Sequence, residues 1–194
     1  MAYRPTVTST APETPSARHA RVAGRFGEVV AGVADWSSPA PVEGWTAADV
    51  VGHLVEWLPG LLAADGVVLD VEWTGDPAQD WSRHAAAVQA LLDSPRAAEP
   101  FTHQHLGTQP LGQAVDRFYT TDVLLHTWDL ARASGQDAGL DEAECAELLA
   151  GMQPMDEFLR SSGQYGPKVP VPDDAPAVDR LMGFLGRDPA GNPG

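Results

Sequence analysis

The sequence predicts an all-α protein, built as an antiparallel four-helix bundle with short additional helices. Apolar residues recur at spacings of three and four in four long segments, which is the pattern of amphipathic helices. Residues that start and stop helices flank these segments, and only two short stretches could form strands. Because each long helix carries one apolar stripe that needs a partner, a bundle is the most economical arrangement.

Length and composition restrict the class of protein further. The chain has 194 residues, which is enough for one well-buried core, so we expect a single domain. Acidic residues outnumber basic ones 27 to 12, and the net charge of -15 predicts repulsion from nucleic acid and from anionic membranes. No apolar run is long enough for a membrane span, and the single Cys145 excludes an internal disulfide framework.

The ends of the chain differ from its body in composition. Residues 1–16 are rich in Pro, Thr and Ser, so we expect a disordered N-terminal tail there. This stretch lacks the apolar core of a secretory signal, which favours a cytoplasmic protein. We expect the folded domain to cover residues 17–189 and a short C-terminal tail to cover residues 190–194.

The first three helices are predicted from stripes and caps. A helix should run from Ala17 to about Ala34, followed by a Pro-rich connection. Thr46 and Asp49 resemble a capping box, so the second helix should run from Thr46 to Ala64. Asp76-Pro77 starts the third helix, which should end near Ser94-Pro95.

The second half of the chain contains the longest helical segment. It runs from Pro110 to Ser134 and ends at the C-cap residue Gly135. Shorter helices should follow over residues 141–151, 155–160 and 177–185, separated by an extended Pro- and Gly-rich passage. Two stretches, residues 67–73 and 101–106, could each be a short strand or irregular.

The long helix places polar residues within its apolar arc. At about 100° per residue, Asp122, His126 and Asp129 share an arc with apolar residues such as Tyr119 and Leu125. Asp122 and His126 are four residues apart, so both can reach one ion. A carboxylate in an apolar interior costs several kcal/mol unless it is paired or bound to metal.

The second helix supplies a third candidate ligand. His53 lies at the edge of that helix's apolar stripe and faces inward. His53, Asp122 and His126 together would supply the two imidazoles and one carboxylate typical of an open divalent metal site. Zinc is the first expectation, with nickel or manganese as alternatives. The residues alone leave a second interpretation open, in which Asp122 and His126 are a hydrogen-bonded pair that satisfies itself.

Three blocks of sequence resemble one bacterial family. Residues 43–54 (EGWTAADVVGHL) and 119–131 (YTTDVLLHTWDLA) resemble two motifs of the DinB/YfiT-like superfamily. The branch is the actinobacterial one, related to the metal-binding domain of mycothiol-dependent maleylpyruvate isomerase. Residues 165–172, 179–181 and 184–189 resemble the C-terminal signature of the same branch.

The resemblance implies a four-helix bundle that holds a divalent metal. The family's ligand positions fall on His53, Asp122 and His126. Many members have histidine where this chain has Asp122, and the isomerase has glutamate there, so metal preference can differ. The isomerase also has a second domain with no counterpart in these residues, so its isomerase activity does not carry over.

The predicted function is a metal-dependent transferase, or an isomerase-like enzyme, that uses a low-molecular-weight thiol. A divalent ion held by two imidazoles and one carboxylate keeps a positive charge, which favours thiolate formation. The resemblance suggests mycothiol as the thiol, which would react with a small-molecule electrophile; the same ion could instead activate water. A non-catalytic metal-binding or ligand-sensing module is the alternative. We also consider a homodimer, which no sequence feature tests.

Other residues receive structural interpretations. His103 and His105 could flank the site, but a surface loop is the simpler explanation. Cys145 lies on an acidic helix with no basic neighbour and is expected to be a buried structural residue. Trp57 could line a pocket, and Glu56 and Asp49 are expected to be exposed. Asp129 should either orient a ligand or pair with an arginine such as Arg132.

Overall fold

The computed structural model describes residues 12–103, 107–161 and 165–191, and most of them are helical. The predicted predominance of helix is therefore confirmed. The elements, in chain order, are α1 (Pro15–Ala31), α2 (Ala47–Ala63), α3 (Pro77–Asp93), η1 (Pro95–Ala98), β1 (Pro100–His103), β2 (Gly107–Pro110), α4 (Leu111–Ala114), η2 (Val115–Thr120), α5 (Thr121–Ala133), α6 (Glu142–Met152), η3 (Gln153–Met155), α7 (Asp156–Ser161) and α8 (Ala177–Leu185).

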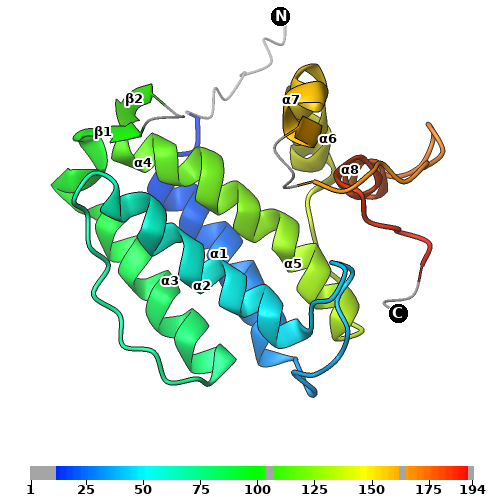
Figure 1. Ribbon diagram of the computed structural model, residues 1–194, viewed down its shortest axis with the longest axis horizontal. Coiled ribbons are helices and arrows are strands. Elements are labelled where there is room, and N and C mark those ends of the chain that lie inside the picture. Colours follow the sequence, from blue (N-terminus) through cyan, green and yellow to red (C-terminus); the bar gives the residue numbers. More distant parts are fainter. Residues whose placement is uncertain (1–11, 104–106, 162–164, 192–194) are drawn as a thin grey trace, which may run out of the picture.

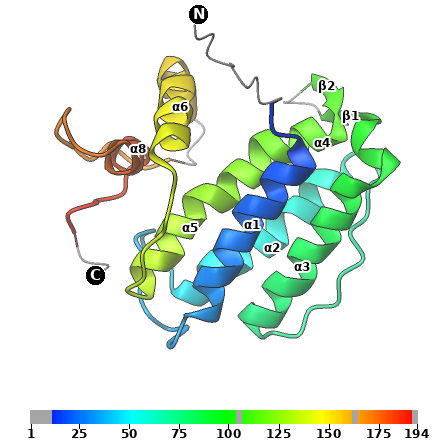
Figure 2. The same cartoon turned by 180° about the vertical axis from the view of Figure 1, so that it is seen from behind.

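The main body of the molecule consists of α1, α2, α3 and the segment that leads through η2 into α5. Helix α1 packs against α3 and α5, and α2 packs against the same two helices. Helices α6 and α8 pack on each other, and in both views they lie on the side of α5 that faces away from α3 (Figures 1 and 2). The helical stripes predicted from the sequence thus face one another in a shared apolar core.

Two predicted helix starts are confirmed by their cap geometry. Thr46 and Asp49 form a reciprocal capping box, in which the Asp49 carboxylate accepts the Thr46 backbone N–H at 2.8 Å. The Asp76 carboxylate accepts the N–H groups of Ala78 and Gln79 ahead of Pro77, the first residue of α3. These caps fix the residues at which α2 and α3 begin.

The N-terminal helix begins before the predicted boundary. Its first residue is Pro15 rather than Ala17, because the Thr14 hydroxyl accepts the Ala17 N–H and proline fits the first helical position. Pro15 and Ser16 of the predicted tail are therefore helical, whereas residues 1–11 of that tail lie outside the described residues. At the other end of the chain, residues 192–194 also lie outside them.

The longest predicted helix is continuous but not uniform. Between α4 and α5, the six residues Val115–Thr120 of η2 are π-helical, so each turn there is wider than in an α-helix. Burial in α5 extends beyond the predicted apolar arc, because every residue from Val123 to Ala131 is buried. This happens because α1 and α2 pack on α5 and because Arg187, which follows α8, also contacts it.

The two undecided stretches have different outcomes. Residues 67–73 are irregular and belong to the long connection between α2 and α3. Strand β1 pairs antiparallel with β2, with Phe101 opposite Gln109, so the strand interpretation is confirmed for part of residues 101–106. Residues 104–106, which include His105, lie outside the described residues. Within the described ranges, no helix combines the length and the apolar character that crossing a bilayer requires.

Candidate metal centre

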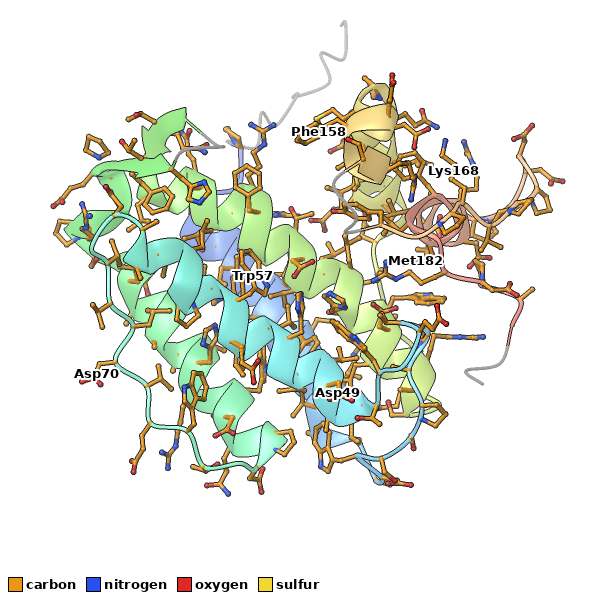
Figure 3. All side chains as sticks on the ribbon, in the orientation of Figure 1. Asp49, Trp57, Asp70, Phe158, Lys168 and Met182 are labelled. Atoms are coloured by element: carbon orange, nitrogen blue, oxygen red, sulfur yellow. The ribbon has the colours of Figure 1, made fainter. Side chains whose placement is uncertain are left out.

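The three predicted ligands lie together between α2 and α5. His53 Nε2 is 3.0 Å from Asp122 Oδ2, and His126 Nε2 is 3.6 Å from Asp122 Oδ1. His53 comes from the second turn of α2, while Asp122 and His126 are one turn apart on α5. Figure 3 shows Trp57, the residue one turn after His53, at the same crossing of the two helices. The helices therefore bring together residues that are 69 positions apart in the chain.

The donor set fits a divalent transition metal. One ligand atom from each of the three residues lies within 4.8 Å of the other two, and no other group of this kind occurs among the residues that the structure describes. Ligands at about 2.0–2.1 Å in a tetrahedral site are separated by about 3.3 Å. The observed separations of 3.0 and 3.6 Å from Asp122 bracket that value, so small side-chain movements would suffice.

Asp122 is held as an acceptor by several donors. The indole N–H of Trp57 donates to Asp122 Oδ2 at 3.0 Å, the same oxygen that His53 approaches. Burial by itself would raise the pKa of the Asp122 carboxyl, but His126, His53 and Trp57 outweigh that effect and lower it. Asp122 is therefore an ionised carboxylate at neutral pH, the form that binds metal.

His126 is oriented by a buried ion pair. Its Nδ1 lies 2.8 Å from Asp129 Oδ2, which leaves Nε2 directed toward Asp122. Arg187 donates two hydrogen bonds to Asp129, from Nε at 3.0 Å and from Nη2 at 2.7 Å. Although burial opposes it, the charges of Arg187 and His126 lower the pKa of Asp129 to about 2. A carboxylate that fixes the second nitrogen of a histidine is a common feature of metal sites.

The arginine in this pair differs from the predicted one. Asp129 both orients a candidate ligand and pairs with an arginine, but the arginine is Arg187 and not Arg132. Arg132 instead lies over the Trp128 ring and donates to the Gly191 carbonyl. Arg187 was not predicted as the partner of Asp129. The available signal was the glycine before it, Gly186, because glycine commonly ends a helix and redirects the chain. Gly186 ends α8 in the left-handed conformation, with φ 93°, and turns the chain back toward α5.

Aromatic rings surround the two histidines. The Trp45 ring lies 5.0 Å from the His53 ring and 5.6 Å from the His126 ring, centroid to centroid. That Trp57 lines a pocket stays a prediction, whereas its hydrogen bond to Asp122 was not predicted. His53 retains a side-chain exposure of 32% and Asp122 of 24%, against 6% for His126. The centre is thus open at the His53 side and closed at the His126 side.

The remaining predicted residues fall outside the centre. Glu56 and Asp49 are exposed, as expected, and Asp49 serves the helix cap (Figure 3). Cys145 is fully buried, and burial together with nearby acidic residues raises its pKa to about 12, so the structural interpretation is confirmed. His103 lies on β1 and is not part of the three-residue group. His105, which the sequence analysis considered together with His103, lies outside the residues that the structure describes.

Comparison with known proteins places this geometry in context. A family model described as the mycothiol maleylpyruvate isomerase N-terminal domain matches residues 17–131. Two uncharacterized proteins of Mycobacterium tuberculosis, from strains CDC 1551 / Oshkosh and ATCC 25618 / H37Rv, are each 29% identical over 187 residues. These alignments cover 89% of this chain and 97% of each relative. No solved structure gives a significant match. The family match includes all three candidate ligands and Asp129, whereas Arg187 lies beyond it.

Proposed function

Because the chain belongs to the family of the mycothiol maleylpyruvate isomerase N-terminal domain, we propose that it is a cytoplasmic metal-dependent enzyme that uses a low-molecular-weight thiol. In this proposal α1, α2, α3 and the α4–α5 segment form a DinB-type four-helix bundle. The cofactor is a divalent metal, with zinc preferred, and mycothiol is the preferred thiol. The reaction is a transfer or isomerisation that acts on a small-molecule electrophile.

One observation carries the proposal. Two imidazoles and one carboxylate from two different helices converge within 4.8 Å, a set with the composition of open catalytic metal sites. A self-satisfied Asp–His pair on α5 would not need His53, yet His53 approaches the same carboxylate at 3.0 Å. The resemblance of both motifs to the family agrees with this interpretation.

The chain's own residues determine what the site can do. The ligand set carries one negative charge, so a bound divalent cation would retain positive charge and favour the thiolate form of a thiol beside it. Asp129 holds the His126 ring, and the rings of Trp45 and Trp57 lie beside the His126 and His53 rings, respectively. Cys145 is buried on α6 with a raised pKa, so the reactive thiol must come from a small molecule.

Metal content tests the site. We expect protein purified without added metal to contain about one equivalent of a divalent ion by elemental analysis, and we expect His53→Ala and His126→Ala to lose it. Asp122→Asn should also lose the ion. Glu56→Gln is its matched control, because Glu56 is an exposed carboxylate one turn from His53 on α2. Unchanged metal content in the His53 and His126 variants would refute the site.

Turnover tests the enzyme. A panel of electrophiles with mycothiol as co-substrate should be converted by the wild type and not by His126→Ala. Equal rates for the two proteins would discard catalysis at this centre. Stoichiometric metal without turnover of any electrophile is the result expected of the alternative, a non-catalytic metal-binding or ligand-sensing module.

A further inference from the structure

A second group of polar side chains lies in the core, apart from the three metal-centre residues. His19 of α1, His84 of α3, and Tyr119 and Thr120 of η2 are each at most 1% exposed. We call them the internal histidine cluster. Rings of His19 and His84 lie 6.3 and 5.5 Å from the Tyr119 ring, centroid to centroid. Among the residues that the structure describes, five of their polar atoms find no hydrogen-bond partner: His19 Nε2, His84 Nδ1, His84 Nε2, Tyr119 Oη and Thr120 Oγ1.

This concentration of unpartnered atoms requires an explanation. Buried polar groups nearly always have partners, and each one without a partner costs free energy. Three separate elements bring the rings of His19, His84 and Tyr119 together, since α1 packs directly on both α3 and η2, and Thr120 directly follows Tyr119 in the chain. The π-helical turns of η2 carry both hydroxyl-bearing members, Tyr119 and Thr120. A guest that bonds to several of these atoms at once would remove the cost.

The protonation of His19 is determined by its neighbour Gln89. The Gln89 amide nitrogen donates to the Ser16 carbonyl, the Ser16 hydroxyl and Asp93, which sets the orientation of the amide. The Gln89 carbonyl oxygen therefore faces His19 Nδ1 at 2.8 Å, so that nitrogen must carry the hydrogen. Consequently His19 Nε2 is an acceptor, and it needs an N–H donor, an O–H donor or a cation.

The other cluster members supply donors and acceptors but no charge. Burial lowers the pKa of His84 to about 4 and raises that of Tyr119 well above its usual value, so both are neutral at physiological pH. A neutral imidazole offers one donor and one acceptor, and each hydroxyl can act as either.

The carboxylates around the cluster are already engaged. Asp93 accepts from Ser16 and Gln89, Asp116 pairs with Arg18, and Asp122 belongs to the metal centre. A cation inside the cluster would therefore keep its charge uncompensated in the core, which is strongly unfavourable. A neutral guest with two donors and two acceptors matches the five atoms better.

We propose that the internal histidine cluster is a hydration site, in which ordered water bridges His19, His84, Tyr119 and Thr120 and so ties α1 and α3 to η2. Buried waters of this kind make about three hydrogen bonds to groups that otherwise lack partners. Trp73, from the connection between α2 and α3, stacks on the His84 ring at 5.9 Å and is 45% exposed. Trp73 therefore contacts both the His84 ring and solvent, and movement of this indole would give water a route to the cluster.

A crystal structure of the full chain tests the proposal directly, at a resolution that reveals ordered solvent. We expect density for at least one water within about 2.7–3.2 Å of His19 Nε2 and of a second cluster atom. Direct hydrogen bonds between the histidines and Tyr119, with no solvent between them, would overturn the proposal. A peak with anomalous scattering at a metal edge inside the cluster would also overturn it, because the guest would be a cation.

Stability measurements provide an independent test, which depends on whether each variant is less stable or more stable than the wild type. Thr120→Val and Tyr119→Phe each remove one hydroxyl with little change of shape. If water satisfies the hydroxyls, each variant should lower the folding equilibrium constant roughly fivefold, the effect of one lost hydrogen bond. Thr127→Val is the matched control, because the buried Thr127 hydroxyl donates to the Val123 carbonyl at 2.8 Å. Thr120 and Tyr119 variants that equal or exceed the wild type, beside a destabilised control, would refute hydration.

Discussion

Asp129 has no solvent-exposed surface, and two partners keep it ionised. Arg187 compensates its charge from the C-terminal segment. His126 Nδ1 contacts the same Oδ2 atom as Arg187 Nη2, and this contact holds the orientation of the imidazole ring. A buried ion pair of this kind adds little net stability, but removing one partner leaves the other charge uncompensated. The single side chain therefore links the proposed metal ligand to the end of the chain.

Asp129→Asn should affect both metal binding and folding. We expect metal affinity to fall about 10–100-fold, because the amide no longer fixes the His126 ring as the carboxylate does. We also expect a loss of about 3 kcal/mol of unfolding free energy, since Arg187 is left buried without its counter-charge. Competition with a chelator and denaturant titration measure the two effects. Asp188→Asn, an exposed carboxylate next to Arg187, is the control, and equal effects in both variants would contradict this role.

His84 should make stability depend on pH. Its pKa is lowered by burial to about 4, from 6.5 in the unfolded chain. Above pH 6.5 the His84 imidazole is neutral in both the folded and the unfolded chain, so the unfolding free energy is not reduced by His84 there. As pH falls from 6.5 to 4, the unfolded chain binds a proton that the folded chain does not, and unfolding becomes more favourable by about 3 kcal/mol.

Denaturant titrations across this pH range test that expectation. His84→Leu should show a shallower loss of unfolding free energy between pH 6.5 and 4 than the wild type. The comparison of slopes removes the contribution of the other titrating groups, which are common to both proteins. Parallel curves would mean that His84 titrates normally in the folded state.

At the scale of elements, α2 and α5 matter most for the proposed function. Helix α2 contributes His53 and begins at a capping box, while α5 contributes Asp122 and His126 directly after the π-helical η2. Periodicity and capping residues predicted both helices, because these signals depend on residues within one turn of each other. The π-helical segment was not predicted, because no local spacing distinguishes it from an α-helix.

The capping box should contribute measurably to the stability of α2. Thr46→Ala removes the hydroxyl that accepts the Asp49 N–H, and we expect it to cost about 1 kcal/mol. Thermal unfolding measures the change. Ser82→Ala, an exposed change within α3, should show no such loss. If Thr46→Ala unfolds at the wild-type temperature, the cap does not stabilise the helix.

At the scale of the whole molecule, a metal ion would join α2 to α5. A ligand that binds only the folded state stabilises it by about 2.7 kcal/mol at 100 times its dissociation constant. The long-range contacts between these helices otherwise consist of core packing and the His53–Asp122 and Trp57–Asp122 hydrogen bonds. Metal binding at this position would therefore stabilise the entire fold.

Removal of metal should accordingly lower the unfolding temperature. We expect a chelator to lower the Tm of the wild type and zinc to restore it. His53→Ala should have a Tm that neither treatment changes, because one of its three ligands is missing. A wild-type Tm that is insensitive to both treatments would contradict a metal site at the α2–α5 crossing.

Local patterns in the sequence determined the helices, their caps and the identity of the three candidate ligands, since each pattern involves neighbours a few residues apart. Only the tertiary structure decided that His53 meets Asp122 across 69 positions, and that Asp129 pairs with Arg187 across 58 positions rather than with Arg132. It also assembled the internal histidine cluster from α1, α3 and η2. Such contacts depend on how whole helices pack and where the chain returns, and the spacing of residues along one helix does not encode either.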